Sequence, residues 1–401
     1  MSVLLGNVNQ GLYGGVLMEI PLTRSQTFVP PRNGTVNIIC IGAGGSGGHL
    51  FAAAQGISTG GGAGGYCVKE SLDVTTSSSF VVTIGAGGAG ARSNSAANGV
   101  TGGNTTVSGT GLSATLTANG GTGGSTQLTS NNGLAGGAGG TASNGDINRV
   151  GGAGGTVGAN VTSSANLRAA TGGGAVALLT GVGYAGGSLL LAAGGSAFNS
   201  AQYFATGGAG IGGRGGGLHN VNGSLTEDVQ GFSGGGANHA GNDKSVQYDF
   251  VPSSVTSRGR NETHTFPYAG ASLIGQSAAV GGAGETTDRA CNGGGSNTAG
   301  NNRDDNSFFG YNVQGDKNVH SMGAGGGAIY STVAARGAGH GGAFAGGGAT
   351  GAQVDSDYNI RGGDGGVGGG GGAFYRSGNQ YLGLSGYGGP GMVFIHYTAY
   401  A

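Results

Sequence analysis

A short glycine-rich loop is the clearest candidate for chemistry in the chain. In "TVNIICIGAGGSGG" (35–48), a run of β-favouring residues leads into Gly42, Gly44 and Gly47. This G-x-G-x-x-G spacing lets a backbone approach a pyrophosphate closely before a helix begins, so the chemistry it suggests is dinucleotide binding.

Composition and context weaken that interpretation. Glycine supplies 102 of the 401 residues, whereas ordinary proteins contain roughly 7% glycine. The same spacing returns in "TIGAGGAG" (83–90), and "HLFAAAQG" (49–56) is too short for the amphipathic helix that a dinucleotide fold needs after its loop. We therefore predict that 42–48 binds no nucleotide and packs backbone against backbone.

No other pattern predicts catalysis or metal binding. The histidines are scattered and form no H-E-x-x-H motif. Those that lie beside glycine tracts, where they could converge at the ends of a bundle, are His219, His239, His320 and His340. The carboxylates that could form a pair of the glycosidase type are Asp243, Asp249, Asp304 and Asp305, and solvated loop carboxylates are the simpler interpretation. The sequence predicts a protein that is not an enzyme and has no metal or other cofactor.

The cysteines favour a structural role. Cys40, Cys67 and Cys291 form no C-x-x-C pair, and two of them fall in strand-like runs. Buried, reduced thiols are the prediction, and a disulfide or a metal-ligand role stays open as the alternative.

The charge of the chain excludes partners that are recognised through strong electrostatic fields. The formal net charge is −1, charged residues make up 8% of the sequence, and the sequence pI is about 6.6. We therefore expect no nucleic-acid binding and no attraction to anionic membranes. No apolar run reaches the roughly 18 residues of a membrane-spanning helix, and residues 1–10 lack the features of a signal peptide. Membrane insertion and secretory export are not expected.

The glycine content itself predicts the fold. Collagen needs glycine at every third position and abundant proline, but this chain has six prolines and no unbroken triplet register. Disorder is not favoured either, because 36% of the residues are hydrophobic and the net charge is small. Glycine costs roughly 0.5–1 kcal/mol more than alanine in regular structure, so a fold that keeps so many must need bare backbone. Extended three-fold segments packed side by side, a polyglycine-II bundle, meet that need with almost no α-helix.

Composition divides the chain into four parts. They are 1–21, an attachment or packing segment; 22–119, a β-rich section; 120–390, a glycine-rich bundle with inserted loops; and 391–401, a strand that returns to the β-rich section. Within the first part, the apolar stretch 14–22 is either a β-segment or a surface buried against a partner. A hairpin is expected around 109–111. We predict one compact, mainly β and irregular domain in which the terminal strands meet.

Several stretches occur in an order that points to one family. "SQTFVPPRNGTVNIICIGAGGSGG" (25–48) has a short strand, a proline, a β-run and GAGG; 60–90 has Gly-Gly-Tyr before a strand and "IGAGG" after the next; "GGPGMVFIHY" (388–397) closes the chain. These blocks resemble the glycine-rich domain of phage tail-fibre and tail-tip proteins over about 22–125 and 362–398. The alternation of tracts and polar loops is similar in architecture to the receptor-binding adhesins of T-even-type phages, whose tracts form a polyglycine-II bundle.

Two glycine-poor segments, 242–269 and 301–320, interrupt the tracts and concentrate aromatic residues beside arginine. Such mixtures are typical of surfaces that recognise sugars and proteins. The candidate contacts are Tyr248, Phe250, Arg258, Arg260, Phe266, Tyr268, Arg303, Phe308, Phe309 and Tyr311. The alternative is that these aromatics close the ends of a bundle that has little apolar surface of its own.

The resemblance implies a non-enzymatic protein of the virion, located in the tail fibre or tail tip and made in the host cytoplasm. Its partners would be a host cell-surface receptor, either a glycan or an outer-membrane protein, and other tail or fibre subunits. Whether it forms a homo-oligomer stays open. Two alternatives remain: a purely structural virion or surface protein, and an ice-binding protein built on a polyglycine-II bundle.

Overall fold

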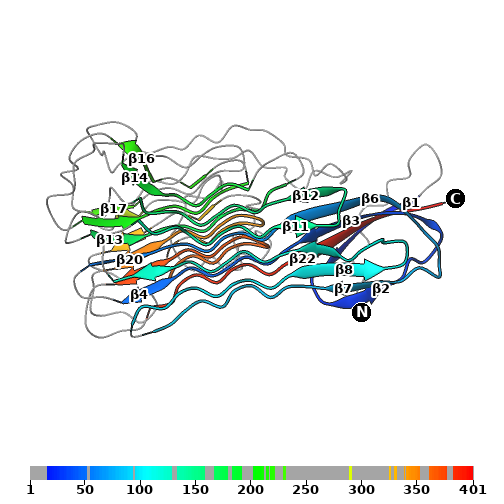
Figure 1. Cartoon of the computed structure of the whole chain (residues 1–401), viewed down its shortest axis with the longest axis horizontal. Helices are drawn as coiled ribbons and strands as arrows, with labels where there is room; N and C mark the ends of the chain where they lie inside the picture. Colours follow the sequence, from blue (N-terminus) through cyan, green and yellow to red (C-terminus); the bar gives the residue numbers. More distant parts are fainter. Residues whose placement is uncertain are drawn as a thin grey trace, which may run out of the picture.

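The computed structural model consists of β-strands and extended glycine tracts, and its described part contains no helix. The described residues are 16–51, 55–93, 95–128, 133–158, 167–178, 183–191, 202–211, 214–215, 217–221, 229–231, 289–290, 325–326, 329–331, 338, 340–352, 361–376 and 383–400. Along the long axis, antiparallel sheets occupy one end, extended tracts run through the middle, and further sheets occupy the other end (Figure 1). The prediction of a β-rich fold with almost no α-helix is confirmed.

The first end, which we name the terminal end, is a pair of five-stranded antiparallel sheets. One sheet has the order β1-β22-β3-β6-β12 and the other β11-β9-β8-β7-β2. The strands of the first are β1 (Val16–Leu22), β22 (Met392–Ala399), β3 (Gly34–Ile41), β6 (Tyr66–Val74) and β12 (Ile147–Arg149). Those of the second are β11 (Ala142–Ser143), β9 (Leu116–Ala118), β8 (Thr105–Gly109), β7 (Phe80–Thr83) and β2 (Gln26–Phe28).

The two sheets pack against each other as a sandwich, and alternating apolar side chains hold them together. Ile38, Phe80, Val107 and Ile395 are fully buried in one cluster that takes residues from both sheets. Strand β22 lies between β1 and β3, so the last strand meets the first ones, as predicted. The apolar stretch near the N-terminus is therefore a β-segment. The predicted hairpin is also present, as β8 and β9.

Extended glycine tracts form the middle of the molecule, and their backbone hydrogen bonds define layers. The outer layer is 98–104, 119–125 and 135–141; the second is 85–91, 42–48, 59–65 and 150–157; the third is 384–391, 369–373, 171–177 and 183–189. Tract 42–48 bonds to six others, which surround it on all sides: 59–65, 85–91, 98–104, 119–125, 369–373 and 384–391. This arrangement is the predicted polyglycine-II bundle.

At many positions only glycine lets another tract lie alongside, although Ala43 and Ser46 are also buried within tract 42–48. A Cβ on Gly44 would lie 1.9 Å from the carbonyl oxygen of Gly369, and one on Gly370 would lie 2.0 Å from that of Gly61. Real Cβ atoms do not approach that closely, so the tracts touch through bare backbone.

On tracts at the surface of the bundle, every third residue exposes its side chain to solvent. In "GAGGAG" (85–90), Ala86 and Ala89 are exposed while Gly85 and Gly88 are buried. A three-fold extended segment advances about 3.1 Å per residue, so every third side chain points the same way. On the outer layer these positions, which we name the outer face, are Asn98, Thr101, Asn104, Asn119, Thr122, Ser125, Ala135, Ala138 and Thr141. None of them is charged.

The sequence zones do not separate in space. Tracts 42–48, 59–65, 85–91 and 98–104 belong to the zone 22–119, yet they lie in the bundle and two of them form its interior. The reason is that many strands of these sheets directly adjoin a tract: β3 ends at Ile41 and the first interior tract begins at Gly42, and β6 begins at Tyr66 directly after tract 59–65.

The other end, which we name the distal end, contains mostly parallel sheets. Their orders are β10-β5-β13-β15-β17, β18-β19-β20-β21-β4 and β14-β16. The strands of the first are β10 (Thr126–Gln127), β5 (Gly56–Ser58), β13 (Leu167–Ala170), β15 (Gln202–Ala205) and β17 (Val229–Gly231). Those of the others are β18 (Arg289–Ala290), β19 (Ile329–Ser331), β20 (Thr350–Ala352), β21 (Phe374–Arg376), β4 (His49–Phe51), β14 (Leu189–Leu191) and β16 (Leu218–Val221).

Threonine marks the point where a distal strand becomes a glycine tract. Thr59, Thr171 and Thr206 directly follow β5, β13 and β15, each is fully buried, and each begins a T-G-G sequence. Thr171 Oγ1 accepts a hydrogen bond from the Gly60 amide (3.0 Å) and donates one to the Gly155 carbonyl (2.7 Å). Backbone N–H and C=O groups point in different directions in a β-ladder and in a glycine tract. The threonine hydroxyl therefore forms hydrogen bonds with backbone groups that would otherwise be unpaired where the strand becomes a tract.

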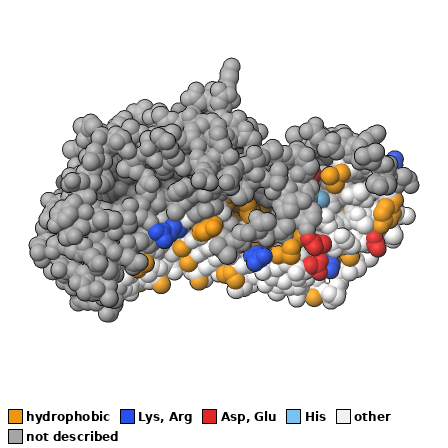
Figure 2. Space-filling view, turned by 90° about the horizontal axis from the view of Figure 1, so that it is seen from above, with side chains coloured by type: hydrophobic (Ala, Val, Ile, Leu, Met, Phe, Trp, Pro, Cys, Tyr) orange, Lys and Arg blue, Asp and Glu red, His pale blue; other side chains and the backbone are white. Residues whose placement is uncertain are grey.

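Few charges interrupt the described surface. On the face shown in Figure 2, the described charged side chains are few: isolated Lys or Arg side chains and one group of acidic side chains with a basic one beside it. The described residues include no helix that is long and apolar enough to cross a membrane.

Candidate functional site

The glycine loop that resembles a nucleotide-binding motif has no amide left for a phosphate. Gly42, Gly44 and Gly47 donate their backbone N–H groups to carbonyls of Gly65, Gly389 and Gly386, at 2.9, 2.8 and 3.0 Å. The residues after the loop form strand β4, whereas a dinucleotide site needs the N-terminus of a helix. The prediction that these glycines pack backbone against backbone is confirmed.

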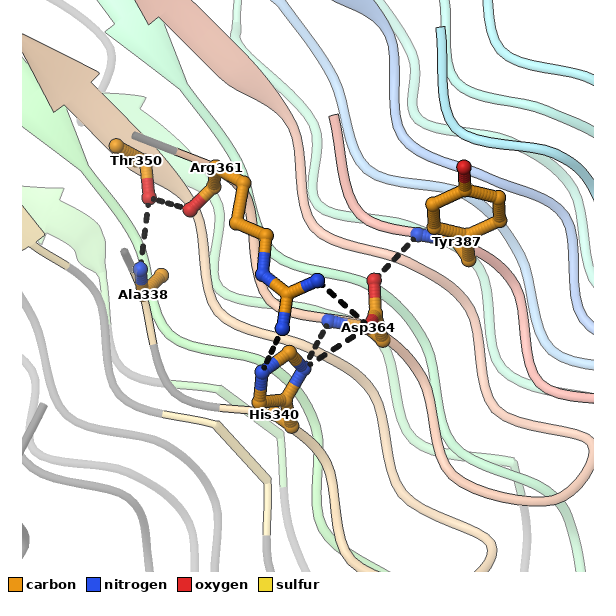
Figure 3. Close-up of polar contacts among 6 residues, drawn as sticks. All are labelled: Ala338, His340, Thr350, Arg361, Asp364 and Tyr387. Atoms are coloured by element: carbon orange, nitrogen blue, oxygen red, sulfur yellow. Dashed lines mark hydrogen bonds and ion pairs between the residues drawn. The ribbon is translucent and has the colours of Figure 1, made fainter. Parts of the chain in front are cut away.

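A polar cluster on three neighbouring tracts brings three ionisable side chains together (Figure 3). His340 Nδ1 lies 3.2 Å from the Asp364 carboxylate, and Arg361 Nη2 lies 3.0 Å from His340 Nε2. Arg361 Nη1 is 3.8 Å from the same carboxylate. The other carboxylate oxygen of Asp364 accepts the Tyr387 backbone N–H at 2.9 Å. The side chain of His340 is buried, whereas those of Arg361 and Asp364 are about one quarter exposed.

Both ring nitrogens of His340 lie within hydrogen-bond distance of N–H donors. The guanidinium of Arg361 can only donate, so Nε2 of His340 accepts. Nδ1 of the same ring accepts the Asp364 backbone N–H at 2.9 Å, and it also lies 3.2 Å from the Asp364 carboxylate. A His–Asp pair can serve as general base for a substrate hydroxyl only if the second ring nitrogen is free. Here Arg361 occupies it, so the cluster ties tracts together and does not abstract a proton.

The charged state of Asp364 depends on its partners. Burial acts to raise the pKa of this carboxyl group, but the hydrogen bonds from His340 and the Tyr387 amide, together with the positive charge of Arg361, outweigh it. The net pKa of Asp364 is lowered. A lowered folded-state pKa stabilises the fold above the pKa of the unfolded chain, about 3.9 for Asp, and this stabilisation disappears as the pH falls through the folded value.

We expect Asp364→Asn to destabilise the protein at neutral pH, by about 1.5–3 kcal/mol for loss of hydrogen bonds to a charged group. The thermal midpoints of wild type and variant, measured from about pH 7 down to about pH 3, should approach each other below about pH 4, because the unfolded carboxyl group then binds a proton more readily than the folded one. Two midpoint curves that stay equally far apart over the whole range would contradict the assignment.

The structure tests few of the residues singled out from the sequence. All ten candidate contacts of segments 242–269 and 301–320 lie outside the described residues, as do His239, His320, Cys291 and the four candidate carboxylates. His340 is described and joins the polar cluster. Among the described residues, no three His, Cys, Asp or Glu side chains gather as a metal site. Cys40 and Cys67 are buried and reduced, as predicted.

Sequence analysis missed Arg361 and Asp364, although a signal existed. They stand three apart in "RGGD" (361–364), which places both on one side of a three-fold segment.

Comparisons with known proteins give one kind of information. The model of the family described as glycine-rich domain matches residues 22–259, more than half of the 401-residue chain. Comparison with curated proteins found no match.

Proposed function

Because the chain belongs to the glycine-rich domain family, we propose that its bundle is a rigid scaffold for binding segments in a viral tail fibre or tail tip. In this proposal the protein is not an enzyme. It binds a host cell-surface receptor, a glycan or an outer-membrane protein, and contacts other tail or fibre subunits.

The observation that carries the proposal is how the two glycine-poor segments are tethered. Strand β19 runs parallel to β20 and β21, which lead out of the bundle, and β18 runs antiparallel to β19. Residues 301–320 therefore connect two directly paired strands, and 242–269 lie between β17 and β18. The described strands nearest to both segments in the sequence therefore belong to the distal sheets.

A scaffold of this kind favours binding for a physical reason. Interior tracts are locked by backbone hydrogen bonds on all sides, so the strands that flank the segments have little freedom to lose. Reduced loss of entropy strengthens binding, and several copies on one particle multiply the effect. The aromatic and arginine content of the segments suits hot-spot contacts.

The test measures both binding to host cells and the thermal midpoint for three variants, Tyr248→Ala, Phe266→Ala and Phe308→Ala. If these side chains contact the receptor, binding of the purified protein to host cells should weaken by about thirty-fold per site, because a hot-spot contact is worth about 2 kcal/mol. The thermal midpoint should stay near that of wild type. Tyr387→Ala serves as control, because Tyr387 is 42% exposed on the bundle, outside both segments.

Other outcomes favour the alternatives. If the three variants keep wild-type binding and melt early, the aromatics close the bundle and the receptor surface lies elsewhere. If the wild-type protein does not bind host cells, a purely structural role is supported.

One observation favours a second candidate, ice binding. The outer face presents small, uncharged side chains at regular three-residue intervals on three neighbouring tracts, a pattern that suits a regular crystal surface. Thermal hysteresis of the purified protein, abolished by Thr122→Lys in the centre of this face, would support it. Freezing without hysteresis would exclude it.

A further inference from the structure

Two cysteines face each other at the junction between the sandwich and the bundle. Cys40 on β3 and Cys67 on β6 are direct partners in the antiparallel register. Both are fully buried in the same apolar cluster of the sandwich core.

The backbone geometry suits a covalent link. Residues directly opposite in an antiparallel pair have Cα atoms about 4.5–5.5 Å apart, inside the roughly 4.4–6.8 Å range of disulfides. Both side chains lie on the same face of the sheet in one buried cluster, so the bond requires no change in strand pairing.

A disulfide at this position would join the two ends of a segment that contains interior tracts of the bundle. Cys40 lies two residues before tract 42–48, and Cys67 lies two residues after tract 59–65. Both tracts are interior tracts of the second layer, with neighbours on every side. A disulfide between Cys40 and Cys67 would close a covalent loop that contains both interior tracts, 42–48 and 59–65.

We propose that Cys40 and Cys67 are a disulfide-forming site that locks the base of the bundle. The oxidant is a small-molecule disulfide such as oxidised glutathione. A thiolate of the pair attacks it, one glutathione leaves, and the second cysteine attacks the mixed disulfide and releases the other. Two S–H bonds are lost, one S–S bond forms, and two electrons and two protons reside on two molecules of reduced glutathione.

The folded protein protects the reduced pair. The hydrogen bond with Cys67, then burial, and then the proximity of a second ionisable thiol raise the pKa of Cys40. Because the thiolate is the attacking species, exchange in the closed fold is slow. The bond is therefore expected to form during folding in an oxidising medium, or on local opening.

The experiment uses the full chain with Cys291→Ala, so that only the pair remains. The denatured protein is refolded in a mixture of reduced and oxidised glutathione, which removes access as a limit. We expect the intact mass to fall by two hydrogens and a linked peptide to join Cys40 and Cys67. The thermal midpoint should rise by about 5 °C or more relative to the protein refolded with reductant.

Cys40→Ala and Cys67→Ala in the same background are the matched controls. Their midpoints should not respond to the redox mixture, whatever the substitutions themselves cost. A natively refolded protein that keeps both thiols free to alkylation after denaturation would overturn the proposal. So would a linked protein that melts below its reduced form.

Discussion

Gly44→Val is expected to abolish native folding, the largest effect of any single substitution in the bundle. The new Cβ would lie 1.9 Å from the carbonyl oxygen of Gly369, an atom of the rigid backbone that no side-chain rotation can move away. Relieving the clash requires tract 369–373 to move, and its own neighbours would then lose hydrogen bonds. Destabilisation should exceed about 5 kcal/mol, and soluble expression followed by thermal unfolding is the measurement.

A matched control is Ala89→Val, in the same sequence context but on an exposed position of the neighbouring tract. The added methyl groups point to solvent there, so the midpoint should change little. If the Gly44 variant is soluble and melts within a few degrees of this control, the backbone-contact explanation of the glycines fails.

Thr171→Val should produce the second largest loss. Valine keeps the shape of threonine but removes the hydroxyl that pairs the Gly60 amide and the Gly155 carbonyl. Both groups would remain buried without that partner, at about 1–3 kcal/mol each. Denaturant unfolding should therefore show a free energy of unfolding lower by about 2–6 kcal/mol.

Thr171→Ser retains the hydroxyl and separates the hydrogen bonds from packing. We expect the serine variant to recover most of the lost stability, less the contribution of one methyl group. Equal losses for valine and serine would show that the methyl group, and not the hydroxyl, is what the junction needs.

Much of this fold could be predicted from local sequence. The β-runs that became β3, β6, β7 and β22 carry alternating apolar residues, and the tracts carry too much glycine for any packed alternative. The path of the chain could not be predicted, because glycine contacts have no side-chain identity. Nothing in "GAGGSGG" (42–48) distinguishes the tract at Gly369 as its neighbour from any other tract.

The candidate site, too, could be predicted only in part from the sequence. The three-residue spacing of Arg361 and Asp364 is visible in the sequence, but His340 comes from another tract, and only the lattice brings it within 3.2 Å of the carboxylate. The threonines at the strand ends could have been noticed as repeated T-G-G sequences. Their role became clear only when their hydroxyl partners were known.

The interior tract 42–48 also determines when the protein can fold. Gly44 and Gly47 donate their hydrogen bonds to Gly389 and Gly386, and strand β3 pairs along its whole length with β22. These partners leave the ribosome long after the tract itself, and contacts so distant in sequence form slowly. In a nascent chain, tract 42–48 therefore lacks some of its hydrogen-bond partners until synthesis has passed β22. Premature termination before residue 383 would remove neighbours of the innermost tract, so its damage would begin in the interior of the molecule and spread outward.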